Sequence, residues 1–204
     1  MQLDPGFWDR IAEKYAKSPV KDQEAYAQTL ERTRAHLKPS DHVLELGAGT
    51  GTTALKLAGD VAHITATDFS PEMMRIAADK GAGTENVTFV TADIQSAPGR
   101  EDGYDAVLAY NLLHLVPDLA GDLAQVAKLV KPGGLFISKT ACLAANPVYR
   151  AAVPIMRWMG KAPYVRFVTI GQLEAAITQA GFEIIERGLY PKSPPNRFVV
   201  ARKV

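Results

Sequence analysis

The chain has 204 residues, of which 47% are hydrophobic and 22% charged, a composition typical of one soluble globular domain. Its formal net charge of +1 gives no long-range field that would attract a nucleic-acid backbone, so we do not expect a nucleic-acid partner. Cys142 is the only cysteine, which excludes an intramolecular disulfide and a cysteine-based metal cluster, and no metal site is expected. Met1 to Arg10 lack the apolar core of a signal peptide, and no run of about 18 apolar residues is present, so we expect a cytoplasmic protein without a transmembrane segment.

The first part of the chain is predicted to form helices and then a strand. Residues 5–37 are expected to be helical, with a break at Ser18-Pro19, because apolar side chains recur at helical spacing on both sides of the proline. His42–Leu46 follows as a short apolar strand of the kind that is buried on both faces of a parallel sheet. It runs into Gly47-Ala48-Gly49-Thr50-Gly51, where glycines at G-x-G-x-G spacing let the backbone turn sharply and approach a ligand. A helix expected from Thr52 to Ala58 would point its N-terminal N–H groups at that ligand.

Strands and helices alternate along the rest of the chain, which predicts a parallel sheet covered on both faces. The expected strands are His63–Thr67, Asn86–Thr91, Tyr104–Tyr110, Leu135–Lys139, Glu183–Arg187 and Arg197–Ala201, and the expected helices are Pro71–Lys80, Leu119–Leu129 and Ile170–Ala180. The last two strands are joined without a helix, so they should pair antiparallel, because a parallel pair needs a crossover. We therefore predict an α/β three-layer sandwich: a mostly parallel seven-stranded sheet with the last strand antiparallel and helices on both faces.

Two features of this pattern resemble landmarks of one enzyme family. They are the acid Glu45 ahead of the G-x-G-x-G turn, and the turn Lys131-Pro132-Gly133-Gly134 before the fifth strand. Over residues 35–204 the chain resembles the class I (Rossmann-like) S-adenosylmethionine-dependent methyltransferases that act on small molecules. The resemblance implies one domain over residues 1–204, with residues 1–34 as a helical lid and residues 143–169 as a cap-like insertion.

The same resemblance implies S-adenosylmethionine as the cofactor, with S-adenosylhomocysteine as the product. The reaction implied is methyl transfer by in-line displacement to a small-molecule or lipid-like acceptor, by a monomer or homodimer. The cofactor-binding turn would consist of Gly47, Ala48, Gly49, Thr50 and Gly51. Glu45 lies in an otherwise apolar strand, and its burial requires a partner. Either the backbone of the turn or the cationic aminoacyl end of the cofactor would supply one.

Further cofactor contacts are implied at the end of the second strand. Asp68 would accept hydrogen bonds from both ribose hydroxyls, the task of an acid at this offset in nucleotide-binding folds. The alternative is an acid that only caps the following bend. Phe69 and Met73 would enclose the adenine, although Met73 would equally suit the core side of the next helix.

Two later strand ends complete the implied site. Asp93 would accept a hydrogen bond from the adenine amine, with Ile94 beside the ring, unless Asp93 only stabilises the turn at the strand end. Asn111, followed by Leu112, would face the methionine moiety of the cofactor and the reacting centre, mainly through its backbone.

Catalysis of methyl transfer consists mainly of aligning the acceptor and excluding water, so a general base is needed only when the acceptor must lose a proton. His114 is the best candidate base, because the unperturbed pKa of histidine is close to neutral. Its alternative is a structural histidine. Tyr15 would close over the methionine end of the cofactor as part of the lid, or would simply pack between helices. Cys142 is expected to be an inert buried thiol.

The acceptor cannot be named from these residues. The insertion around residues 146–159 is rich in aromatic, methionine and basic residues and has three interpretations: a cap over the substrate, a contact with a membrane surface, or a helical hairpin packed on the sheet. Two other functions also fit a strand–glycine–helix unit, namely an NAD(P)-dependent oxidoreductase and a non-catalytic S-adenosylmethionine-binding protein. The G-x-G-x-G spacing disfavours the oxidoreductase, because dinucleotide-binding turns use G-x-G-x-x-G.

Overall fold

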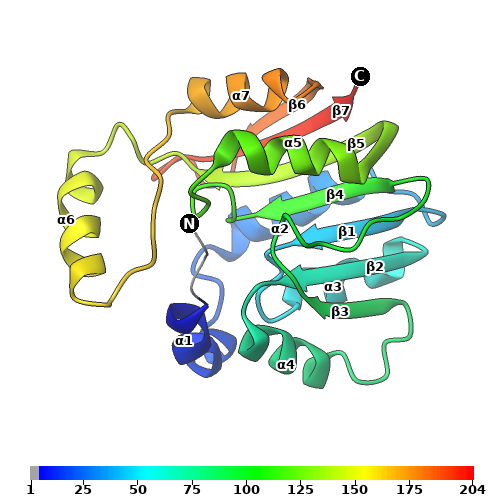
Figure 1. The fold of residues 1–204 in the computed structure, drawn as a ribbon, viewed down its shortest axis with the longest axis horizontal. Helices are drawn as coiled ribbons and strands as arrows, with labels where there is room; N and C mark the ends of the chain where they lie inside the picture. The colour runs from blue at the N-terminus through cyan, green and yellow to red at the C-terminus, as the bar shows by residue number, and fades with distance from the viewer. Residues whose placement is uncertain (1–4) are drawn as a thin grey trace.

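The computed structural model describes residues 5–204, so residues 1–4 of the predicted lid lie outside the described residues. Seven strands form one sheet in the order β3-β2-β1-β4-β5-β7-β6 (Figure 1). Their bounds are β1 (His42–Leu46), β2 (His63–Asp68), β3 (Val87–Thr91), β4 (Tyr104–Tyr110), β5 (Val130–Ala141), β6 (Phe182–Leu189) and β7 (Asn196–Lys203). The last strand, β7, is antiparallel to both of its neighbours, and the other strands run parallel. The predicted sheet is confirmed.

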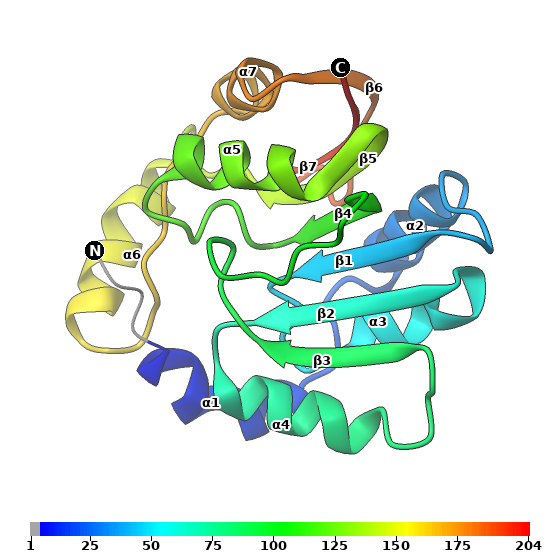
Figure 2. The ribbon, with the colours of Figure 1, turned by 45° about the vertical axis from the view of Figure 1, so that its right-hand side comes forward.

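Helices cover both faces of this sheet (Figure 2). They are α1 (Gly6–Lys17), α2 (Gln23–Arg34), α3 (Thr52–Leu57), α4 (Pro71–Lys80), α5 (Leu119–Leu129), α6 (Pro147–Trp158) and α7 (Ile170–Gln179), with a 3-10 turn at Ala58–Asp60. Apolar residues of α5 and α7 share one core with Val107 and Phe136 of the sheet. Residues of α2 and α3 share a second core with Val43 and Ile64, which lie on the opposite face. The three-layer arrangement follows from these two cores.

The strand order creates a crevice beside β1. The chain passes from β1 outward to β2 and β3 and then crosses back to β4 on the other side of β1. In open α/β sheets such a reversal leaves a crevice at the carboxyl ends of the two strands, and ligands bind there. In Figure 1 the arrowheads of β1, β2, β3 and β4 point to the same edge, on the side where α6 lies.

Several sequence-based boundaries differ from the structure: β6 and β7 extend beyond the predicted ranges at both ends, and two further differences are larger. The segment Lys131-Pro132-Gly133-Gly134, predicted as a turn, lies inside β5, which begins at Val130. Val130 already pairs with Tyr104, and the ladder then shifts register before Leu135 pairs with Ala106, so the four residues form an irregularity within the strand. Helix α2 also differs from the prediction, because it ends at Arg34 and does not continue to residue 37.

The insertion at residues 143–169 forms one helix, α6, followed by a stretch without helix up to Thr169. All 12 residues of α6 are at least partly exposed. The helical hairpin considered for this segment is therefore not formed. Within residues 5–204, none of the helices has the length and apolar character needed to cross a membrane.

Candidate functional site

A cavity of about 1290 Å3 lies at the carboxyl ends of the parallel strands. Pockets that hold one drug-sized ligand measure roughly 300–1,000 Å3, so this cavity is larger than one such ligand requires. Its walls come from the glycine-rich turn, the ends of β2, β3 and β4, helix α1, and the chain from Arg157 to Val165. Most of the side chains and backbone segments predicted to bind the cofactor lie on it: Tyr15, Glu45, Gly47, Ala48, Gly49, Asp68, Phe69, Met73, Asp93, Ile94, Asn111 and Leu112.

The glycine-rich turn has the backbone conformation that its spacing predicts. Gly47, Gly49 and Gly51 all have positive φ, at +65°, +54° and +72°, a region that side chains with a Cβ rarely occupy. A Cβ on Gly47 would lie 2.9 Å from Leu112 Cδ1, whereas a Cβ on Gly49 would meet only the Tyr15 ring, at 3.6 Å. Gly49 is therefore the open point of the turn.

The last two residues of the turn face away from the cavity. A Cβ on Gly51 would lie 2.7 Å from Phe89 Cε1, and neither Thr50 nor Gly51 lines the cavity. Lys80 Nζ of α4 donates to the Thr50 carbonyl (2.7 Å) and lies 3.1 Å from its hydroxyl. These two residues fix the turn against α4 and β3.

Asp68 holds the turn from the end of β2. Gly49 N–H donates to its Oδ2 and Ser70 N–H to its Oδ1, both at 2.9 Å. Burial raises the pKa of this carboxyl, while the two backbone donors oppose the shift. Asp68 is thus a cap for the following bend and also part of the cavity wall, so its two proposed roles are compatible.

Glu45 is 2% exposed, and its Oε2 has no hydrogen-bond partner among residues 5–204. Burial, and to a smaller extent the nearby Asp68, raise the pKa of the Glu45 carboxyl to about 8. A buried carboxyl with a free oxygen at a cavity wall needs a proton or a cation to compensate the cost of burial.

Tyr15 of α1 reaches over this end of the cavity. Its ring lies beside Gly49 and meets the Trp8 ring edge-on, with centroids 6.3 Å apart. Burial, together with the negative charges of Asp68 and Glu45, raises the pKa of the Tyr15 hydroxyl. This hydroxyl therefore stays protonated and can donate a hydrogen bond.

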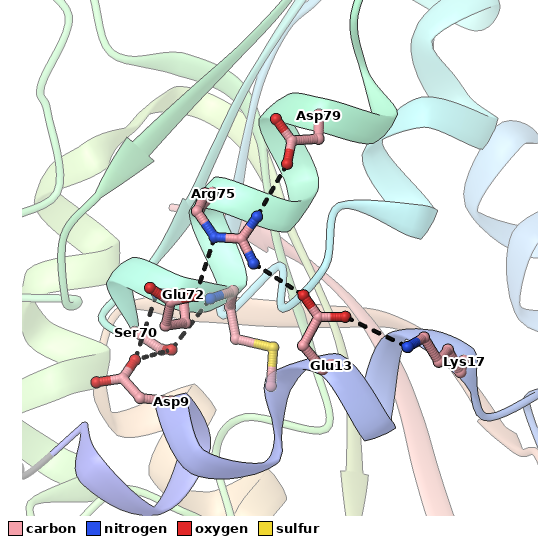
Figure 3. Close-up of polar contacts among 8 residues, drawn as sticks. Asp9, Glu13, Lys17, Ser70, Glu72, Arg75 and Asp79 are labelled. Atoms are coloured by element: carbon pink, nitrogen blue, oxygen red, sulfur yellow. Dashed lines mark hydrogen bonds and ion pairs between the residues drawn. The ribbon is translucent and has the colours of Figure 1, made fainter.

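Polar contacts hold α1 against α4, as Figure 3 shows. Asp9 Oδ1 accepts from the Ser70 hydroxyl (2.5 Å) and from Glu72 N–H (3.4 Å). The Arg75 guanidinium bonds Glu13 of α1 at 2.9 Å, and it also contacts two carboxylates on its own helix. These contacts place the α1 wall of the cavity.

The remaining predicted cofactor contacts occupy the strand ends. Asp93 Oδ1 accepts from the backbone N–H (2.8 Å) and hydroxyl (2.6 Å) of Ser96, so it stabilises the turn after β3. Met73 is buried and packs with Ala12 of α1, while also reaching the cavity. Asn111 has a φ of +54°, and no other non-glycine residue within 5–204 has a positive φ. Such strain is typical of functional sites, and it is maintained here by a 2.7 Å bond from Asn111 N–H to the Lys139 carbonyl.

His114 lies on the cavity wall in an apolar environment. Burial lowers the pKa of its imidazole to about 4, so the ring is neutral at pH 7. Its Nδ1 has no hydrogen-bond partner in the described part of the chain. Cys142 is buried, and burial raises the pKa of its thiol.

Several cavity residues were not predicted from the sequence. They include Trp8, Arg10, Gln95, Asp122, Arg157 and Tyr164. Gln95 Nε2 donates to Asp122 Oδ1 (2.7 Å), and the Arg157 guanidinium lies over the Tyr164 ring at 5.1 Å. These residues come from four separate segments; the predicted lid included Trp8 and Arg10, the composition of the insertion pointed toward Arg157, and no sequence signal pointed toward Gln95 or Asp122. Across residues 5–204, no group of three or more His, Cys, Asp or Glu side chains is arranged to hold a metal ion.

Comparison with known proteins identifies the family. A family model described as a methyltransferase domain matches residues 20–187. A highly reducing polyketide synthase from a Fusarium species is 31% identical over 179 residues, covering 79% of this chain and 7% of the synthase. A demethylmenaquinone methyltransferase from Clavibacter sepedonicus is 37% identical over 98 residues, covering 48% of this chain and 40% of that enzyme.

The chain thus spans less than half of the length of either relative. Among solved structures, an S-adenosylmethionine-dependent methyltransferase from Mesorhizobium loti matches with a TM-score of 0.70 at 21% identity, covering 85% of this chain and 96% of that one. This likeness concerns the fold alone. The family match over most of the chain shows that the protein belongs to the methyltransferase family, and its fold is the class I, Rossmann-like one.

Proposed function

We propose that this protein transfers the methyl group of S-adenosylmethionine to a small, largely apolar organic acceptor. The observation that carries the proposal is one cavity with two chemically different ends. One end holds the glycine-rich turn, two buried carboxyls and Tyr15 of α1, and the other is walled by residues of the segment 157–165, which is apolar or aromatic apart from Arg157 and Lys161. A cavity of this size admits a cofactor and an acceptor together.

The residues at the first end fit the cofactor. Bound S-adenosylmethionine supplies a methyl group on a positively charged sulfur, together with a cationic amino group. The free oxygen of Glu45 is suited to accept from that amino group, and a nearby cation would favour the ionised carboxylate. Asp68 accepts from the backbone N–H groups of Gly49, Ser70 and Phe69, and the lone pairs that remain would accept from the ribose. Thr50 and Gly51 are proposed to support the turn on the side of α4 and β3 and not to contact the cofactor.

The second end suits an acceptor that reacts without a strong protein base. His114 is neutral at pH 7 and weakly basic, so its free Nδ1 would hold a hydroxyl or enol of the acceptor by accepting a hydrogen bond. Trp8 and Tyr15 of α1 line the cavity, and although Tyr15 is 49% exposed, the two rings are proposed to shield the reacting centre from water when both molecules are bound. His114 and Tyr15 are therefore proposed to position the acceptor and close the site.

The names of the relatives agree with an acceptor of this class. One is a polyketide synthase and the other a demethylmenaquinone methyltransferase, and both names refer to apolar organic molecules. The non-catalytic alternative would bind the cofactor with the second end closed.

Two measurements test the proposal. Calorimetry with S-adenosylhomocysteine should show binding, whereas NAD should not bind. Mass spectrometry of mixtures with S-adenosylmethionine and a panel of quinols, phenols and β-keto thioesters should then find a methylated product. Binding of the cofactor without any product from the panel would favour the non-catalytic alternative, and binding of NAD alone would refute the proposal.

A further inference from the structure

Helix α6 presents a stripe of apolar side chains to solvent. Val148, Ile155 and Trp158 are 70%, 58% and 88% exposed. Their spacings of seven and three residues place them on one face of the helix. In Figures 1 and 2, α6 stands apart from the sheet and from the helices that cover it. An apolar stripe on a helix that packs so little of itself on the domain points to an external contact.

Positive charge accompanies this stripe. The chain carries no acidic residue between Asp122 and Glu174, whereas Arg150, Arg157 and Lys161 lie on α6 or directly after it. Within residues 5–204, neither Arg150 nor Lys161 forms an ion pair. The surface formed by α6 and residues 159–161, called here the α6 surface, therefore has an apolar stripe on one side of the helix and cations on its other side and at its end.

The α6 surface continues into the mouth of the cavity. Arg157, Gly160 and Tyr164 line the cavity, and Arg10 of α1 donates a 3.4 Å hydrogen bond to the Gly160 carbonyl. The same segment thus forms the outer surface on one side and the cavity wall on the other. Whatever contacts the α6 surface also lies next to the opening of the cavity.

We propose that the α6 surface docks on an anionic membrane. The boundary between headgroups and acyl chains accepts an apolar stripe on one helix face, and tryptophan is enriched at that depth. Anionic headgroups attract the cations of Arg150 and Lys161, and each basic residue near the surface strengthens this attraction. A second copy of this chain fits less well, because it would bring these cations together, and a stripe of three side chains is far smaller than the roughly 800 Å2 per partner of a stable dimer.

The docking stands independently of the reaction. Its consequence for catalysis rests on the proposed function: an apolar acceptor dissolved in the bilayer would enter the cavity through the mouth beside α6. The test therefore measures docking without any acceptor.

The first experiment is co-sedimentation of the full chain with extruded vesicles. Vesicles of phosphatidylcholine with a quarter phosphatidylglycerol should bind the protein, and vesicles of phosphatidylcholine alone should bind it at least about tenfold more weakly. Raising the salt should weaken binding to the anionic vesicles, because it screens the charges. With Trp8→Phe as background, the fluorescence of Trp158 should shift to shorter wavelength on binding.

Two double variants separate the apolar and the charged contribution. Ile155→Glu with Trp158→Glu should abolish binding to both kinds of vesicle. Arg150→Glu with Lys161→Glu should lower binding to anionic vesicles more than about tenfold. The matched control is Lys56→Glu with Lys128→Glu, which makes the same charge change at exposed lysines of α3 and α5. This control should bind anionic vesicles within about twofold of the unaltered protein.

A thermal melt of each variant shows that the domain is folded, so a loss of vesicle binding can be assigned to the surface. Three results would overturn the proposal: no binding to anionic vesicles, unchanged binding by the Arg150→Glu, Lys161→Glu variant, or a dimer in light scattering that Trp158→Glu dissociates. Failure of methyl transfer with intact vesicle binding would count against the proposed function alone.

Discussion

The end of the cavity beside the glycine-rich turn and the end beside α6 are built in opposite ways. At the first end, backbone hydrogen bonds and buried side chains fix each group: Asp68 holds Gly49, and Lys80 holds Thr50. At the second end, α6 has no fully buried residue and contributes partly exposed side chains such as Arg157. The difference agrees with the proposed function, in which the packed turn binds the cofactor and the exposed segment contacts the acceptor, because loops and surface helices tolerate change that packed turns do not.

Replacement of Gly51 should produce the largest change and would test whether the turn is rigid. Gly51→Ala forces a side chain into φ +72° and places its Cβ 2.7 Å from Phe89 and 2.9 Å from Ala77. We expect the free energy of unfolding to fall by about 3 kcal/mol, measured by chemical denaturation. Gly99→Ala is the control, since a Cβ there meets no atom within 4 Å. Equal losses in both variants would contradict a rigid turn.

Removal of the Asp68 carboxylate should have the next largest effect. Asp68→Ala takes away two acceptors of backbone N–H groups and the proposed ribose contacts, so the Kd for S-adenosylhomocysteine should rise about 100-fold in calorimetry. Asp79→Ala removes the same charge from an exposed position on α4 and should change the Kd less than about twofold. A thermal melt of each variant without ligand checks that the fold persists. A rise of less than about threefold for Asp68→Ala would show that the cofactor does not use this carboxylate.

Glu45 makes the cofactor end sensitive to pH. In the unfolded chain its carboxyl loses its proton near pH 4.5, whereas in the folded protein its pKa is about 8. Between these values the folded state holds a proton that the unfolded state has released, so the contribution of Glu45 to stability falls as the pH rises. Glu45→Gln removes this dependence and should raise the free energy of unfolding by about 2 kcal/mol at pH 6, with little gain at pH 4.5.

Denaturation curves at a series of pH values measure this difference. The same variant should bind S-adenosylhomocysteine more weakly, because the amide cannot carry the charge that a cationic amino group favours. A gain in stability that is equal at both pH values would mean that the Glu45 carboxyl does not titrate in this interval.

The contrast between the two ends also explains what could be predicted from the sequence. The seven strands, the glycine-rich turn and the position of Asp68 follow from local patterns, because a buried strand and a turn with positive φ restrict the residues at each position. The orientation of Thr50 toward Lys80 depends on how α4 packs, which no local pattern records. The extension of β5 to Val130 was missed because Pro132 and Gly133 are typical of turns, whereas here they form an irregularity inside the strand.

The acceptor end was less predictable for a related reason. Trp8, Arg157 and Tyr164 come together from distant segments, and their types alone fit a solvent-exposed helix as well as a cavity wall. His114 was found by its place after β4, but the direction of its pKa shift depends on the apolar side chains that bury it. Such three-dimensional surroundings are not visible in one sequence.

Truncation of Trp158 should have the smallest effect, and it tests the other half of the comparison. Because this side chain is 88% exposed and α6 packs so little on the domain, Trp158→Ser should change the free energy of unfolding by less than about 0.5 kcal/mol. Phe182→Ala, at a position that is 1% exposed, should cost about 4 kcal/mol in the same denaturation assay. A large loss for Trp158→Ser would mean that α6 stabilises the domain, and the exposed stripe would then be part of the fold rather than a surface kept for contact with a partner.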